Sequence, residues 1–162
     1  EPTTNAGPEL ATSPIPSEVS DPITCMKNFQ KCGYSRSSQS ENFMWNWNGD
    51  LYDGMGAAAE GQVAVLRSPA FQHRGKAQYL KFYHQIPTTD TIKIKFLNHH
   101  DLTEKLLSSQ SSITDGLELV CINLPQVTAN SSLSFEAIRG DNSMKASKHT
   151  AIRNVETKYG YC

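Results

Sequence analysis

The stretch Thr91-Ile-Lys-Ile-Lys-Phe-Leu97 decides the fold class of this chain. Ile92, Ile94 and Phe96 occupy alternate positions, and a lysine separates each from the next. Successive side chains of a β-strand point to opposite faces of a sheet. The stretch therefore predicts a strand with one apolar face and one charged face.

The same period of two recurs along the chain from residue 43 onward. Strands are predicted at 63–66, 78–86, 117–123, 133–137 and, more weakly, 150–156. Residues that favour turns, mainly glycine, asparagine, aspartate and proline, lie between them. Many short strands with few helices imply two antiparallel sheets packed face to face. We predict an all-β, two-sheet antiparallel β-sandwich of jelly-roll type, with an immunoglobulin-like sandwich as the alternative.

One segment favours a helix. Asp101-Leu-Thr-Glu104 has the spacing of a capping box before Leu106 and Leu107. A helix this short is marginal without packing. A helical turn is therefore one expectation for this segment, and an edge strand or loop is the other.

The first 24 residues differ in composition from the rest. Residues 1–24 hold five of the eight prolines, together with serine and threonine, and have little apolar mass for a core. We interpret them as a Pro/Ser/Thr-rich linker or extended arm. The alternative is that the end of this arm, near residues 19–23, packs as an edge strand. A single folded domain is expected over residues 25–162.

The charge balance and hydropathy exclude several classes of partner. The chain has 15 Lys plus Arg against 16 Asp plus Glu, so no basic surface for nucleic acid is predicted. No run of about 18 apolar residues is present that could span a membrane. No signal peptide is visible at Glu1, as expected of a mature or trimmed ectodomain. Membrane attachment is expected only through the anchor of a parent protein.

Cysteine usage indicates the compartment. Cys25, Cys32, Cys121 and Cys162 can form two disulfides with three possible pairings, and their spacing does not match a zinc site. Asn130-Ser131-Ser132 is a glycosylation sequon, so an N-glycan on Asn130 is expected. Together these features predict an extracellular protein, either secreted or a cell-surface ectodomain.

Candidate catalytic and metal-ligating residues are few. His99-His100-Asp101 could bind a transition metal, but adjacent strand residues point apart, which favours a polar turn. The densest acidic cluster is Asp50, Asp53 and Glu60, which loop solvation explains better than catalysis. No serine-nucleophile elbow or phosphate-binding loop is present. We expect no enzyme activity, no catalytic residue and no metal site.

Two further groups of residues have both a structural and a functional interpretation. Trp45 and Trp47 share one face of a strand, where we expect core packing; the alternative is an exposed platform that stacks on sugars. A set of cations could gather on one sheet face or simply be solvated. The set comprises Arg67, Arg74, Lys76, Lys81, Lys93 and Lys95.

Four groups of motifs follow one another in a fixed order over residues 25–162. They are Cys25…Phe29…Cys32-Gly33-Tyr34; Phe43-Met-Trp-Asn-Trp47; the segments 61–71 and 79–84; and a closing run over 124–125, 135–140, 151–155 and 160–162. In this order they resemble the MAM domain, an extracellular module named for meprin, the A5 antigen (a neuropilin) and receptor phosphatase mu.

The resemblance implies a function. MAM domains are β-sandwich modules of secreted or cell-surface receptor-type proteins, so the chain would be a non-catalytic adhesion or protein-interaction module. Its partner would be an extracellular ligand, a receptor or a second copy of itself. The alternative is a glycan-binding, lectin-like jelly roll, which predicts exposed aromatic side chains and convergent polar side chains on one sheet.

The chain departs from the family at the residues that form its cation site. Arg153 and Asn154 stand where the family has an acidic pair, and Gln30 replaces a further acidic residue. A hard divalent cation needs several oxygen ligands, usually including carboxylates. We therefore expect no calcium and no other cofactor.

The family's third cysteine would fall near Tyr79, whereas here the third cysteine is Cys121. If Cys162 still closes a disulfide, its partner has moved. We predict the pairs Cys25–Cys32 and Cys121–Cys162.

Overall fold

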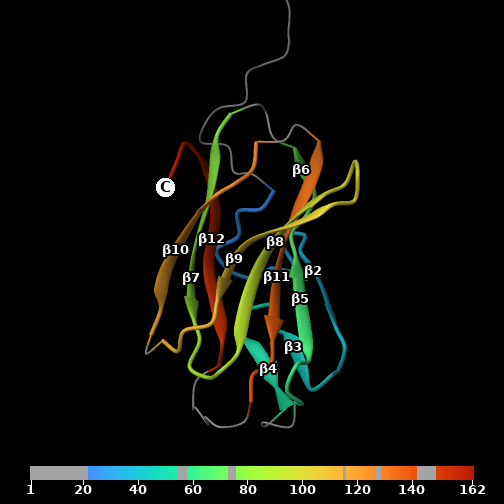
Figure 1. Ribbon diagram of the computed structural model, residues 1–162, viewed down its shortest axis with the longest axis vertical. Helices are drawn as coiled ribbons and strands as arrows, with labels where there is room; N and C mark the ends of the chain where they lie inside the picture. Colours follow the sequence, from blue (N-terminus) through green and yellow to red (C-terminus); the bar gives the residue numbers. More distant parts are fainter. Residues whose placement is uncertain (1–21, 55–57, 73–75, 115, 127–128, 142–148) are drawn as a thin grey trace, which may run out of the picture.

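The computed structural model describes residues 22–54, 58–72, 76–114, 116–126, 129–141 and 149–162. Antiparallel β-strands make up its regular structure (Figure 1). The prediction of an all-β antiparallel sandwich is confirmed. A helix of the length and hydropathy needed to cross a membrane is not found among these residues.

The larger sheet has the strand order β2-β5-β11-β8-β9, and β6 also pairs with β11. Its strands are β2 (Ser35–Ser38), β5 (Val63–Arg67), β6 (Phe71–Gln72), β8 (Thr91–Asn98), β9 (Glu104–Gln110) and β11 (Asn130–Ile138).

The smaller sheet has the order β10-β7-β12, and a separate two-stranded sheet joins β3 to β4. In Figure 1 the smaller sheet lies on the left, the larger sheet lies towards the right, and β3 and β4 lie at the lower end. The strands are β3 (Phe43–Trp45), β4 (Leu51–Asp53), β7 (Gln78–Gln85), β10 (Glu118–Asn123) and β12 (Ala151–Tyr159).

Alternate residues of the facing strands form the core. Ile92 and Ile94 of β8 are fully buried, as the period of two predicts. Phe82 of β7 meets Phe135 of β11 edge to face, with ring centroids 5.3 Å apart. Because these rings come from different sheets, their contact shows that the two sheets pack on each other.

Trp45 joins the β3–β4 pair to the larger sheet. Its side chain is fully buried, and the indole N–H donates to the carbonyls of Ala64 (3.1 Å) and Phe135 (3.2 Å). Trp47 is half-buried beneath the Arg36 guanidinium, 4.5 Å from the ring centroid. The core interpretation therefore holds for Trp45, and neither tryptophan forms an exposed platform.

The end of the N-terminal arm packs against the domain. Ile23 is fully buried, and Cys25 forms an antiparallel bridge to Val155 of β12. The backbone N–H of Thr157 donates to the Thr24 hydroxyl at 3.2 Å. Packing therefore begins at least two residues before the expected boundary at Cys25. The remainder of the arm, residues 1–21, lies outside the described residues.

The segment with capping-box spacing is a turn followed by an edge strand. The Asp101 carboxylate accepts hydrogen bonds from the Thr103 hydroxyl (2.6 Å) and backbone N–H (3.0 Å), which closes the turn. β9 then begins at Glu104 and pairs with β8. Of the two expectations for this segment, the edge strand is confirmed and the helical turn is wrong, because strand pairing with β8 outweighs the local capping signal.

Disulfides join Cys25 to Cys32 and Cys121 to Cys162, which is the pairing expected from the sequence. The first closes a tight loop at the start of the domain. The second spans a sequence separation of 41 residues and ties the end of the chain to β10.

Non-reducing peptide mapping is predicted to recover the Cys25–Cys32 and Cys121–Cys162 peptides. In the chain-entropy model, a loop of the first size stabilises by about 2.5 kcal/mol and one of the second size by about 4 kcal/mol. Replacing both members of a pair by alanine should therefore cost more at Cys121–Cys162, as measured by urea unfolding. Recovery of a Cys32–Cys162 peptide would refute the pairing.

A buried ion cluster connects all three sheets at one end of the sandwich. Asp90, just before β8, accepts a hydrogen bond from the Arg139 guanidinium at 2.9 Å, and both side chains are 4% exposed. The second carboxylate oxygen of Asp90 accepts from the Thr150 hydroxyl at 3.0 Å, just before β12. The Nε atom of Arg139 lies 2.8 Å from the carboxylate of Asp53, at the end of β4.

Asp90→Asn is predicted to lower the free energy of unfolding by about 3 kcal/mol, because it leaves a buried guanidinium with one carboxylate fewer. The matched control is Glu136→Gln, which removes the half-exposed pair with Lys95 and should cost less than about 1 kcal/mol. Urea denaturation of both variants tests this. Equal losses would show that the cluster has no special role.

His84 gives the domain a pH dependence. The imidazole is 3% exposed, and burial lowers its pKa below the ordinary value, opposed in part by the charge of Glu118. His84 therefore takes up a proton at a lower pH in the folded state than in the unfolded chain, which protonates it near pH 6.5. Because the unfolded state binds more protons than the folded state near this pH, the free energy of unfolding falls as the pH drops below about 6.5.

We predict that the free energy of unfolding decreases between pH 7.5 and pH 5.5 and that His84→Asn flattens this slope. His149→Asn, at an exposed histidine, is the control and should leave the slope unchanged. Urea unfolding at several pH values measures both. A His84→Asn slope equal to that of the parent protein would contradict the assignment.

Candidate functional site

Strand β7 presents aromatic side chains to the outside of the sandwich. Leu80 and Phe82 point into the core and are fully buried, so the alternate residues Tyr79 and Tyr83 point outward. Tyr83 is 36% exposed and Tyr79 is half-buried. Four residues of strand separate them, which corresponds to about 13 Å.

The strand register places polar side chains around these rings. We call the outward positions of the smaller sheet the tyrosine face. They are Tyr79, Lys81, Tyr83 and Gln85 of β7; Leu119, Cys121 and Asn123 of β10; and Arg153, Glu156 and Lys158 of β12.

Apolar and charged side chains alternate across the tyrosine face. Leu119, 52% exposed, lies beside Tyr83. In the next row the Lys81 ammonium lies 3.3 Å from the Glu156 carboxylate, and Lys158 lies 3.8 Å from the same carboxylate. The face therefore combines ring surfaces with hydrogen-bond donors and acceptors in fixed positions.

The end of the chain bounds one side of this face. The disulfide to Cys121 holds Cys162 there, and the backbone N–H of Cys162 donates to the Asn123 side chain at 2.9 Å. A Cβ atom added at Gly160 would lie 3.9 Å from the Tyr79 ring. The end labelled C in Figure 1 accordingly lies close to β7 and β12. The segment around residues 160–162 thus bounds the tyrosine face beside Tyr79.

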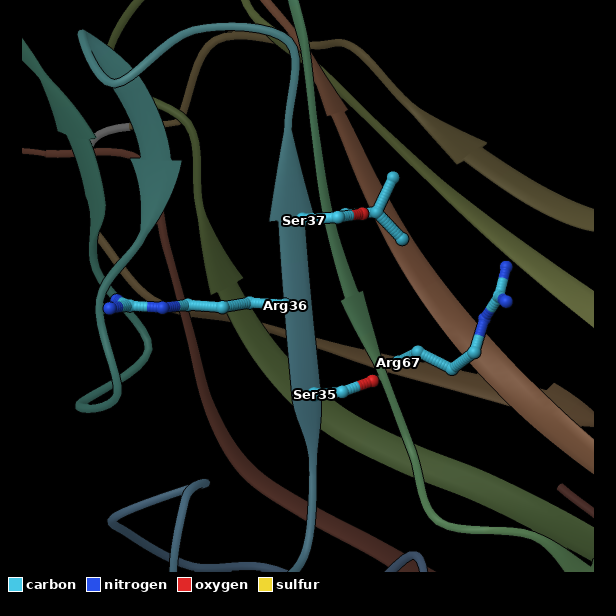
Figure 2. A pocket seen from close by; sticks show the side chains of 5 residues that line it. Ser35, Arg36, Ser37 and Arg67 are labelled. Carbon is cyan, nitrogen blue, oxygen red and sulfur yellow. The ribbon is translucent and has the colours of Figure 1, made fainter.

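A second candidate lies on the outer face of the larger sheet, between β2 and β5. Ser35, Ser37, Val65 and Arg67 line a shallow hollow of about 120 Å³, which we call the Arg67 pocket. Figure 2 shows the side chains of Ser35, Ser37 and Arg67 on one side of the strands and that of Arg36 on the other.

The cations singled out in the sequence do not gather on one face. Lys81 belongs to the tyrosine face, whereas Arg67, Lys93 and Lys95 belong to the outer face of the larger sheet. Lys76 lies over the ring of Tyr159, 5.3 Å from its centroid. Arg74 lies outside the described residues.

The acidic cluster predicted from the sequence is divided between two arginines. The carboxylate of Asp50 lies 2.5 Å from the Arg153 guanidinium, and that of Asp53 lies 2.8 Å from Arg139. Glu60 is exposed. These carboxylates neutralise buried or half-buried guanidinium groups, so they do not form a pair available for acid–base chemistry.

The sequence positions considered for metals have other contacts. Arg153 also donates to the carbonyls of Asn48 (3.2 Å) and Ile152 (2.9 Å), so a guanidinium occupies the place where the MAM resemblance would put carboxylates. His99 shares a hydrogen bond with the Ser132 hydroxyl at 3.0 Å. Within the described ranges, no three His, Cys, Asp or Glu side chains are grouped so that they could hold a metal ion.

Asn130, the predicted glycosylation site, is exposed at the first position of β11. Its carbonyl accepts a hydrogen bond from the backbone N–H of His99 at 2.8 Å, which fixes the backbone there. The side chain remains at the surface, while Ser132 of the sequon is 1% exposed. The N-glycan on Asn130 stays a prediction.

Sequence reasoning missed both candidate surfaces. In β7, polar Gln78 and His84 face inward while Tyr79 and Tyr83 face outward, so hydrophobicity alone misassigns the faces. The sequence signal for this face is the spacing of Tyr79, Lys81 and Tyr83, which places two tyrosines and a lysine on one side of a strand. The Ser35–Ser38 segment is uniformly polar and carries no strand pattern.

Comparison with known proteins identifies the fold of the chain but no sequence family. No family model and no curated protein matches the chain. Several solved structures do match it, at sequence identities of 8–14%. They show the fold alone.

Carbohydrate-binding modules are prominent among these structures. TmCBM61 in complex with β-1,4-galactotriose has a TM-score of 0.54 at 8% identity, covering 78% of this chain and 88% of that chain. A mutant of CBM29-2, a family 29 module complexed with mannohexaose, has a TM-score of 0.50 at 10% identity, covering 85% and 89%. This chain shares their fold.

The enzymatically active domain of tailspike protein 4 from bacteriophage CBA120 also matches, with a TM-score of 0.56 at 9% identity, covering 97% of this chain and 25% of that chain.

These comparisons correct the main functional expectation. The MAM resemblance predicts a protein-binding adhesion module, but the structural neighbours include several carbohydrate-binding modules, which favours the glycan-binding alternative. The jelly-roll architecture is common to both interpretations, so the fold prediction survives the change. The MAM resemblance stays a hypothesis from sequence motifs.

Proposed function

We propose that this domain is an extracellular, non-catalytic module that binds glycans through the tyrosine face. The observation that carries the proposal is the outward placement of Tyr79 and Tyr83 beside the charged group of Lys81, Glu156 and Lys158. Tyrosine rings offer apolar surfaces for sugar rings, and the flanking charges offer partners for sugar hydroxyl groups.

The geometry favours an oligosaccharide. The two tyrosines lie about 13 Å apart along one strand, too far to contact a single sugar from both rings. The chain end beside Tyr79 closes the face on that side. A ligand that contacts both rings would therefore extend along β7.

The size of the face argues for a glycan over a protein. Three strands about 4.8 Å apart, the central one eight residues long, make a surface of roughly 14 by 26 Å. This area, of order 400 Å², is about half of what one partner contributes to a standard protein interface.

The remaining parts of the proposal follow from the charges and the disulfides. Asp50, Asp53 and Glu156 each form an ion pair with an arginine or lysine, so the proposal includes no catalytic carboxylate. Two disulfides are typical of oxidising compartments, which agrees with action outside the cell.

We predict that Tyr83→Ala and Tyr79→Ala each weaken binding of a neutral oligosaccharide at least tenfold, about 1.4 kcal/mol, while leaving the melting temperature nearly unchanged. Tyr52→Ala is the control, because Tyr52 is 43% exposed on β4, away from the face. A glycan array first selects the ligand, with β-1,4-galactotriose and mannohexaose included, and calorimetry then measures the variants. An array with no bound glycan, or binding unaffected by both substitutions, would overturn the proposal.

A further inference from the structure

The Arg67 pocket lies on the opposite side of the sandwich from the tyrosine face. The register pairs Arg67 of β5 with Ser35 of β2 and with Ser134 of β11. The next residue in that row is Lys95 of β8. Two hydroxyl-bearing residues therefore flank the guanidinium-bearing residue on the outer face of the larger sheet.

Arg67 carries a charge that the described residues do not neutralise. The buried Nε atom of Arg67 has no hydrogen-bond partner among the described residues. No carboxylate of the described residues lies within 4.0 Å of the Arg67 guanidinium. The carboxylate nearest in the register is Glu136, which lies 3.1 Å from the Lys95 ammonium. A buried donor without a partner is costly, so a ligand that accepts from it gains both a charge pair and a hydrogen bond.

The pocket limits the size and chemistry of that ligand. About 120 Å³ holds the equivalent of roughly four water molecules, which is enough for a carboxylate or sulfate group. A guanidinium fork binds planar carboxylate and sulfate oxygens through paired hydrogen bonds, and the hydroxyls of Ser35 and Ser37 can donate to the same oxygens.

We propose that the Arg67 pocket binds the carboxylate or sulfate group of an acidic glycan, as a second site on the face opposite the tyrosines. The sugar part of this inference rests on the proposed function; the oxyanion part rests on the pocket alone. Val65 lines the pocket as well and gives the ligand one apolar contact.

The test compares an acidic trisaccharide, trigalacturonate, with neutral β-1,4-galactotriose on the intact domain. Trigalacturonate is expected to shift the Arg67 Nε–Hε signal in nitrogen-15 NMR spectra, and Arg67→Gln is expected to weaken its binding at least tenfold in calorimetry. Arg67→Lys keeps the charge but loses the fork, so an intermediate loss is expected. Binding should also weaken as the salt concentration rises.

Lys93→Gln is the matched control, because it removes one positive charge from the same outer face in a neighbouring row. It should change trigalacturonate binding less than twofold, and melting temperatures of all variants establish that they are folded. Trigalacturonate binding that is unaffected by Arg67→Gln, or equally reduced by Lys93→Gln, overturns the inference.

Separate arms distinguish this inference from the proposed function. Inorganic sulfate or galacturonate monosaccharide that binds Arg67 as tightly as trigalacturonate would overturn the assignment to a glycan. Loss of galactotriose binding in Tyr83→Ala with unchanged trigalacturonate binding supports two independent sites. Absence of any acidic binding, with neutral binding intact, overturns the Arg67 inference alone.

Discussion

The ion pair between Asp90 and Arg139 is the interaction on which the rest of the structure depends. It connects the end of the larger sheet to β4 through Asp53 and to the start of β12 through Thr150. Buried charges are costly unless they are fully paired, and here the Gly140 N–H supplies a further hydrogen bond to Asp90. The cluster therefore fixes the positions of the chain at the end of β4, before β8 and before β12 relative to one another.

The two outer faces of the sandwich differ in how their charges are balanced. On the smaller sheet, Lys81 and Glu156 neutralise each other and leave aromatic surface beside them. On the larger sheet, Lys95 and Glu136 do the same, and Arg67 remains with serines for neighbours. The same fold therefore offers an aromatic surface flanked by an ion-paired group on one side and a cationic hollow on the other.

The sequence predicts what depends on local alternation and misses what depends on distant pairing. The strand containing Ile92 and Ile94 is evident because its polar and apolar residues alternate from Thr91 to Phe96. In β7 the alternation mixes types, since buried His84 and exposed Tyr83 reverse the usual order. The pairing of Arg139 with Asp90 joins residues 49 positions apart and has no local signature.

Motif similarity also misled the functional inference, although it described the sandwich correctly. The motifs that resemble the MAM family include buried residues such as Trp45, Phe82 and Phe135, which maintain a core. Buried core residues indicate how the sheets pack. The same jelly-roll core can support unrelated binding sites on its surface. The motifs do include Tyr79, Tyr83 and Arg67 of the candidate surfaces, but only the strand register shows which residues of other strands lie beside them.

The Cys121–Cys162 disulfide has a consequence for how the domain can be handled. It fixes residue 162 at the margin of the tyrosine face, so a label or solid support joined at that residue would crowd the approach to Tyr79. Reduction of this single bond would remove the covalent link between residue 162 and β10 and leave the hydrogen bond from the Cys162 N–H to Asn123. The position of residue 162 beside the tyrosine face is thus linked to the oxidation state of a cysteine pair.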